Sequence, residues 1–192
     1  MSDLSRHLPL SNRPPQDETS VSTDRRGALA AVVRQADALT SGALDADALT
    51  SSALDPSALD SSALNPDAAA QFLAEARLDR EFAGRPLPEV ADAIAAGGGR
   101  SIRALTDAVR AALSLAGDRP VDLDPVTTGS VALYAIGRAP FDRRAVVGGC
   151  TLRATDDGWE FGRGPERAAP ARQILEFLLA LGDEPPPLTT RR

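Results

Sequence analysis

The 192-residue chain contains one histidine, His7, and one cysteine, Cys150, so it has few imidazole or thiol groups to hold a metal or to serve in catalysis. Nucleophilic catalysis of the Ser-His or Cys-His kind needs a base beside the nucleophile, and a single histidine near the N-terminus argues against it. One cysteine cannot form an internal disulfide, so nothing requires an oxidising compartment.

Lysine and long apolar runs are also missing. All 21 basic residues are arginine, which is typical of a GC-rich genome, and 27 acidic residues give a net charge of -6. A nucleic-acid partner is not expected, because binding a phosphate backbone needs a basic stripe. No segment approaches the roughly 20 apolar residues of a membrane span, and the N-terminus has no apolar run of signal-peptide length. We therefore expect a cytoplasmic protein with no membrane partner.

Both ends of the chain and one internal segment have a composition typical of disordered regions. Residues 1–23 and 183–192 are rich in proline and small polar residues, which predicts disordered tails. The dipeptide Ala-Leu recurs every five residues from Ala38 to Leu64, six times in all, and five of the six lie in the segment 40–64. A period of five turns a helical wheel by about 140° per repeat, so the leucines form no single apolar face. We predict a low-complexity linker; a pentapeptide-repeat coil is the alternative, although six repeats are few for a solenoid.

The rest of the chain predicts helices with recognisable starts. Asp24 can cap a short helix over 24–39, whose apolar residues fall at helical spacing. From residue 65 to 182 we predict one folded α+β domain. Its helices are expected from Asn65-Pro66 to about Phe82, over 89–96, from Ser101 to Gly117 and from Asp124-Pro125 to Gly137, the last with Val131, Leu133, Tyr134 and Ile136 as its apolar residues.

A β-hairpin and an apolar helix are predicted at the C-terminal end of that domain. Leu152 and Ala154 alternate with polar residues, Asp156-Asp157-Gly158 is typical of a turn, and Trp159 and Phe161 share one face of the return strand. We expect the two aromatic rings to pack between the hairpin and a last helix that Pro170 opens; an exposed aromatic site for a partner is the alternative. Cys150 precedes Leu152 on the same face and is expected to be a small buried residue.

Segments Gly137–Arg144, Ala154–Trp159, Gly162–Glu166 and Pro170–Gly182 occur in an order that resembles the C-terminal region of the maleylpyruvate isomerase family. The match covers about residues 118–182. The resemblance to these mycothiol-dependent, DinB-like enzymes implies an N-terminal helical bundle that binds a divalent metal through histidines and a carboxylate, followed by an α/β portion. Since His7 is the only histidine, we assign no metal ligand and no catalytic residue, and we expect no cofactor.

One loop has features of a phosphate cradle. Gly98, Gly99, Arg100 and Ser101 combine flexible backbone amides, a helix start and a guanidinium, which makes them a weak candidate for an anion site. The loop lacks a preceding strand and a Walker lysine. A plain connector between helices is the favoured interpretation.

Three functions remain open at this stage. The leading hypothesis is a non-catalytic binding or accessory module, with an unknown protein or small molecule as its partner. The first alternative is a thiol-dependent transferase or isomerase, which would need Arg100, Arg103 and Arg153 to converge on a pocket. The second is a scaffold or adaptor in which the Ala-Leu repeat is the working part.

Overall fold

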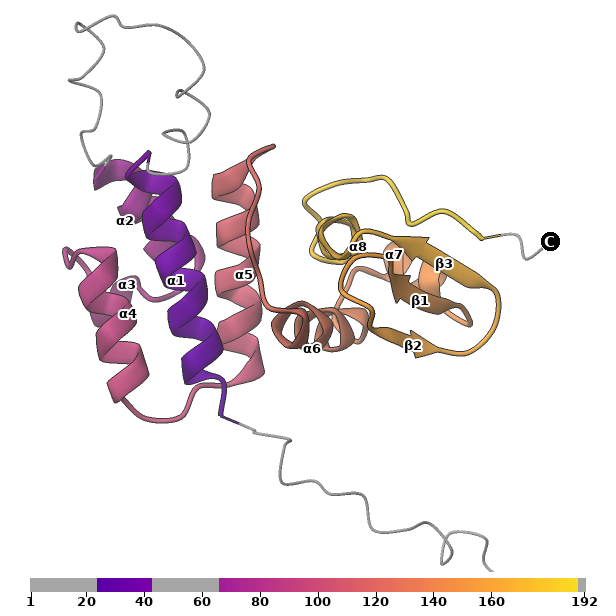
Figure 1. Ribbon diagram of the computed structural model, residues 1–192, viewed down its shortest axis with the longest axis horizontal. Coiled ribbons are helices and arrows are strands. Elements are labelled where there is room, and N and C mark those ends of the chain that lie inside the picture. Colours follow the sequence, from indigo (N-terminus) through magenta and orange to yellow (C-terminus); the bar gives the residue numbers. More distant parts are fainter. Residues whose placement is uncertain (1–23, 43–65, 190–192) are drawn as a thin grey trace, which may run out of the picture.

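A computed structural model describes residues 24–42 and 66–189 and shows a mostly helical protein with a small sheet (Figure 1). Helices α1 to α5 gather in one half, the strands lie with α7 and α8 in the other half, and α6 lies between them. The predicted tail at 1–23, the repeat from residue 43 onward and the proposed cap Asn65 lie outside the described residues.

The helical half is built around α1 (Arg26–Thr40) and α5 (Ile102–Ala116), with α2 (Pro66–Glu75), α3 (Asp79–Phe82) and α4 (Leu87–Ala96) packed beside them. Helix α5 begins at the predicted cap, because the Ser101 side chain accepts a hydrogen bond from the Ala104 amide. It ends at Gly117, whose φ of +55° falls in the region that favours glycine.

Two helix predictions in this half need correction. Helix α2 ends at Glu75, and the chain turns through Arg77, at a φ of 57°, before the short helix α3; the expected single helix to Phe82 is therefore divided. Helix α1 was expected to stand apart from a domain beginning at residue 65. Leu29, Val33 and Ala36 are instead fully buried against α4 and α5, so α1 is part of the same core.

Helix α6 (Pro125–Ile136) begins as predicted, with the Asp124 carboxylate accepting from the Val126 amide. The short helix α7 (Phe141–Val147) was not expected from the sequence. Helix α8 (Ala171–Leu178) follows Pro170 and buries Ile174, Leu175 and Phe177. It packs against α6, α7 and the first strand.

The predicted hairpin is present, and it belongs to a three-stranded mixed sheet. Strand β1 (Thr151–Ala154) pairs antiparallel with β2 (Glu160–Gly162) and parallel with β3 (Glu166–Ala169), in the order β2-β1-β3. Strand β3 was not predicted, because two glycines and Pro165 suggested that regular structure had ended. A side chain at Gly164 would place Cβ 1.9 Å from the Gly149 carbonyl oxygen, so glycine lets the chain return beside β1.

The C-terminal end differs from the disordered tail expected from residue 183. The Thr189 amide donates to the Glu166 carbonyl at 2.7 Å, and the Ala168 amide donates to Pro187 at 3.2 Å. The Arg167 guanidinium also donates to the Pro186 carbonyl at 2.7 Å. Helix α8 ends at Leu178, short of the Gly182 expected from the sequence, and the chain turns at Ala180, whose φ is 61°. The extended chain that follows covers the outer edge of β3 as far as residue 189.

Both halves share one hydrophobic core. Buried residues of α1, α2, α4 and α5 are continuous with Val131 and Ala135 of α6, Leu152 of β1 and Ile174 of α8. The fold class is thus α+β, with a helical segment followed by a small sheet that packs on the C-terminal helix. Cys150 is half-buried in the turn before β1, so it does not take the fully buried position expected on that strand.

Candidate functional site

Helix α6 is apolar on all sides, and one side is uncovered. Its 12 residues include no charged side chain, and it is the only helix of residues 24–42 and 66–189 without one. Val131, Ala132 and Ala135 are buried against the core. Val126 and Leu133, seven positions apart, are 66% and 62% exposed, so they occupy the opposite face.

Trp159 forms one wall of a shallow depression on this face. The depression has a volume of about 410 Å³ and is lined by Val126, Gly129, Ser130, Leu133 and Trp159, with Pro125, Asp157 and Gly158 at its edge. A Cβ added to Gly129 would lie 3.2 Å from the indole ring, so the ring rests on the helix backbone. Phe161 stacks on Trp159 with ring centroids 5.0 Å apart.

A chain of hydrogen bonds fixes the position of the indole. Trp159 Nε1 donates to Thr128 Oγ1 at 3.0 Å, and Thr128 Oγ1 in turn donates to the Asp157 carboxylate. Asp157 belongs to the hairpin turn and Thr128 to α6, so these contacts hold the turn against the helix. Trp159 and Phe161 were expected to pack on the last helix; the ring of Trp159 packs on α6 instead, because only Gly129 leaves room for it.

The neighbouring carboxylate holds the same turn to α8. Asp156 Oδ1 accepts from the Ala171 amide at 2.8 Å and from the Asp157 amide at 2.9 Å. Ala171 is the first residue of α8, so Asp156 satisfies one of the free amides at that helix start. The adjacent carboxylates therefore have separate structural contacts, as expected for a turn.

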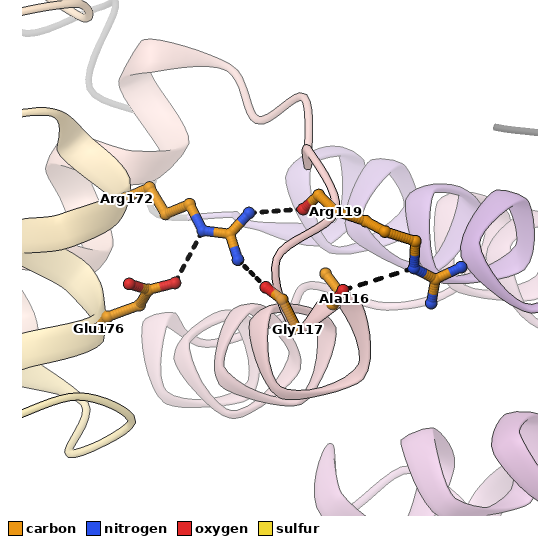
Figure 2. Close-up of polar contacts among 5 residues, drawn as sticks. All are labelled: Ala116, Gly117, Arg119, Arg172 and Glu176. Atoms are coloured by element: carbon orange, nitrogen blue, oxygen red, sulfur yellow. Dashed lines mark hydrogen bonds and ion pairs between the residues drawn. The ribbon is translucent and has the colours of Figure 1, made fainter. Parts of the chain in front are cut away.

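Arg172 joins α8 to the end of α5, as Figure 2 shows. Its guanidinium donates to the carbonyl oxygens of Gly117 and Arg119, and its Nε lies 2.7 Å from Glu176. Arg119 continues the connection by donating to the Leu39 carbonyl at the end of α1, at 2.8 Å. These contacts fix the half that carries the sheet relative to the helical half.

The predicted anion loop binds groups of the chain itself. The Arg100 guanidinium forms a two-pronged pair with Glu81, at 2.6 and 2.8 Å. The Arg100 amide donates to Asp24 Oδ1 at 3.2 Å, and Gly99 lies beside the same carboxylate. Asp24 thus occupies the place that the loop would offer to an external anion, while it also accepts from the Arg26 amide at 3.0 Å.

The ionisation of three groups in this cluster is altered. Hydrogen bonding from the Arg26 amide lowers the pKa of Asp24, with the Arg100 amide as the next contribution. The side-chain hydrogen bond from Arg100 lowers the pKa of Glu81, and the same bond raises the pKa of Arg100. The causes lie within the chain: backbone amides bonded to Asp24, and the side-chain pair of Glu81 with Arg100.

The three arginines that a thiol-dependent enzyme would need are not brought together. Arg103 lies on α5 with its Nε 4.0 Å from Asp107. Arg153 lies on β1, where it binds Glu166 at 2.7 Å. Strand β1 and the loop before α5 belong to different halves of the molecule (Figure 1).

A second apolar cavity lies at the end of α1. Asp37, Thr40, Leu73, Arg85 and Leu87 are among the residues that line its volume of about 400 Å³. Within the described parts of the chain no three His, Cys, Asp or Glu side chains are grouped so that they could hold a metal ion. In the same parts, every helix is too short or too polar to cross a membrane.

The sequence did not single out the α6 face. Leu133 was named with Val131 and Ile136 only as an apolar residue of this helix, and the structure places it on the exposed side. The signal that could have identified the face is the absence of charge over residues 125–136, since a half-buried helix normally carries charged groups on its outer side. The chain matches no protein-family model, no curated protein and no solved structure.

Proposed function

We propose that the protein is a non-catalytic binding or accessory module, and that the face of α6 beside Trp159 is its binding surface. The observation that carries the proposal is the exposure of Val126 and Leu133 on a helix without charge. Full burial of a Val or Leu side chain is favourable by roughly 1.5–3 kcal/mol, and these two exposed side chains do not gain that free energy until something covers them. Contiguous exposed apolar groups next to an aromatic ring are typical of surfaces that bind a partner.

The scaffold around this surface is suited to binding. Trp159 is held by Thr128 and rests on Gly129, so the wall of the depression is fixed before any partner arrives. A fixed aromatic group loses little conformational entropy on binding. Ser130 and Asp157 are the polar side chains that line the depression, and the Asp157 carboxylate is itself held by Thr128.

We further propose that the chain is related to the C-terminal part of the maleylpyruvate isomerase family. The order of segments from Gly137 to Gly182 supports this relation, as does an arrangement in which a helical half precedes a smaller half with a sheet. The segment Ala154–Trp159 supplies the turn, the contact to α8 and the indole of the surface. In this proposal the shared segments are retained for the scaffold.

The binding of 8-anilinonaphthalene-1-sulfonate to highly diluted protein tests the proposal. The dye fluoresces on apolar surfaces and absorbs where tryptophan emits, and Trp159 is the only tryptophan of the chain. We expect bound dye to quench Trp159 and expect Leu133→Ser to weaken this quenching. The matched control is Leu188→Ser, because Leu188 is also exposed, at 57%, but lies beside β3.

Two results would contradict the proposal. The first is dye binding that Leu133→Ser leaves unchanged, which would place the apolar surface elsewhere. The second is a rise in melting temperature with a thiol cofactor such as mycothiol, together with a stoichiometric divalent metal in the purified protein. That combination would favour the thiol-dependent enzyme.

A further inference from the structure

We propose that the partner of the α6 surface is a second copy of this chain, bound with its α6 antiparallel to the first across a two-fold axis. This inference rests on the proposed function, since it names the occupant of the same surface. It makes the protein a homodimer in which Val126, Ser130, Leu133 and Trp159 are covered.

The uncovered face of α6 is complementary to itself. A two-fold interface uses the same patch on both subunits, so a residue i that contacts j requires j to contact i. Val126, Ser130 and Leu133 lie on one face in the order large, small, large. An axis passing near Ser130 places Val126 of each copy beside Leu133 of the other, while the small side chain of Ser130 allows the two helices to approach closely at the centre.

The charges at the two ends of α6 favour the antiparallel direction. Asp122 and Asp124 are exposed before the helix, and Arg138 is exposed just after it. An antiparallel pair brings the acidic end of each helix to the arginine end of the other, whereas a parallel pair would bring like charges together. The helix dipoles are also opposed in that arrangement. No charged side chain within α6 itself would have to lose its water.

A strongly charged partner would find few charges to pair with at the centre of the surface. The depression has one carboxylate, Asp157, which already accepts from Thr128. The remaining lining is apolar or hydroxyl-bearing, and it matches the face of a second α6 in length and in the absence of charge. A small apolar ligand or an unrelated apolar helix is the competing occupant, and the test below separates these cases.

The experiment is sedimentation velocity on the full-length chain over a wide concentration series, with the emission of Trp159 recorded in parallel. We expect the mass to rise from monomer to dimer and the Trp159 emission to shift to shorter wavelength along the same concentration axis. Leu133→Glu is expected to raise the dissociation constant by about 30-fold or more, as for a residue at the centre of an interface. Leu188→Glu, an exposed leucine beside β3, is the control and should leave it unchanged.

Charge exchange tests the direction of the helices. Asp122→Arg and Arg138→Asp should each weaken the dimer, and the double variant should recover most of the loss, because each acidic end would again meet a basic end. Neither residue is buried, so both variants are expected to keep the far-UV circular dichroism of the unaltered chain. This arm therefore remains informative even if Leu133→Glu affects folding.

The outcomes are distinct. A dimer that Leu133→Glu disrupts and the double charge exchange restores supports the inference. A chain that stays monomeric at every concentration overturns it, as does a dimer that Leu133→Glu leaves intact. If the monomeric chain still binds the dye through Leu133, the proposed function stands and only the second copy is excluded. If the dye also fails to bind there, both proposals fail.

Discussion

Removing the side chain of Arg172 should destabilise the whole protein, because this residue connects α8 with the end of α5. The guanidinium donates to the Gly117 and Arg119 carbonyls, which follow the last turn of α5 (Figure 2). Helix ends leave carbonyl oxygens without internal partners, and a nearby arginine both binds them and interacts favourably with the helix dipole. We therefore expect Arg172→Met to lower the free energy of unfolding.

The magnitude follows from the number and exposure of these hydrogen bonds. A hydrogen bond from a charged group contributes about 1.5–3 kcal/mol, so two of them set an upper limit of about 6 kcal/mol. The side chain of Arg172 is 30% exposed, and Gly117 is also exposed, so water replaces part of what is lost. The ion pair with Glu176 adds only about 0.3–0.5 kcal/mol, as for other exposed pairs within a helix. We expect a net loss of about 2 kcal/mol.

Urea unfolding followed by circular dichroism measures this loss. With a denaturant slope of about 2 kcal/mol per molar, the midpoint should fall by about 1 M. Arg34→Met is the matched control, because Arg34 is 54% exposed and pairs with Asp92 at the surface; we expect its change to stay within about 0.5 kcal/mol. Equal effects of the two substitutions would refute the connecting role of Arg172.

Three further predictions concern other contacts of the fold. The hydrogen bond from Arg100 lowers the pKa of Glu81, so the pair contributes its full stabilisation at pH values above 4.5, the ordinary pKa of Glu. This contribution should be lost as the pH falls through the lowered pKa. Acid unfolding of the unaltered chain and of Glu81→Gln measures the loss. Gly164→Ala should cost more than about 2 kcal/mol by urea unfolding, since its φ of 120° is strained for alanine and Cβ would meet a backbone oxygen at 1.9 Å. Trp159→Phe should cost about 1–3 kcal/mol, because the hydrogen bond to Thr128 is lost within a half-buried contact.

Each of these has its own control and its own contrary result. Glu81→Gln should flatten the acid limb of the stability curve, and an unaltered limb would show that the ion pair does not contribute. Gly84→Ala is the control for Gly164→Ala, because its φ of 73° is also positive but nothing lies within 4 Å of the added Cβ. Comparable losses at the two glycines would contradict the contact with the backbone oxygen. For Trp159→Phe, Thr128→Val should produce a similar loss if the hydrogen bond is responsible.

Local signals in the sequence were sufficient for most helix starts and for the hairpin. Ser101 and Asp124 cap α5 and α6 because a short side-chain oxygen followed by a helical pattern satisfies free amides wherever the chain goes. Asp156-Asp157-Gly158 forms the predicted turn for the same local reason. These features depend on residues a few positions apart, so they could be recognised without knowledge of the fold.

Features that depend on distant parts of the chain could not be recognised in this way. The place of α1 in the core, strand β3 and the ordered chain to residue 189 depend on partners 13 to 76 residues away in the sequence. The candidate surface shows the same limit. The sequence shows that α6 is apolar and uncharged, but only the packing of α5 and α8 against it determines which side is buried.

The sequence by itself determined the fold class, the caps at Ser101 and Asp124 and the hairpin turn, because each is a property of composition or of near neighbours. The tertiary structure decided that Asp24 fills the anion loop, that Trp159 rests on Gly129, and that Val126 and Leu133 face outward. The physical reason is that burial and pairing are shared between segments, and an amphipathic or apolar pattern does not specify which surface it will meet.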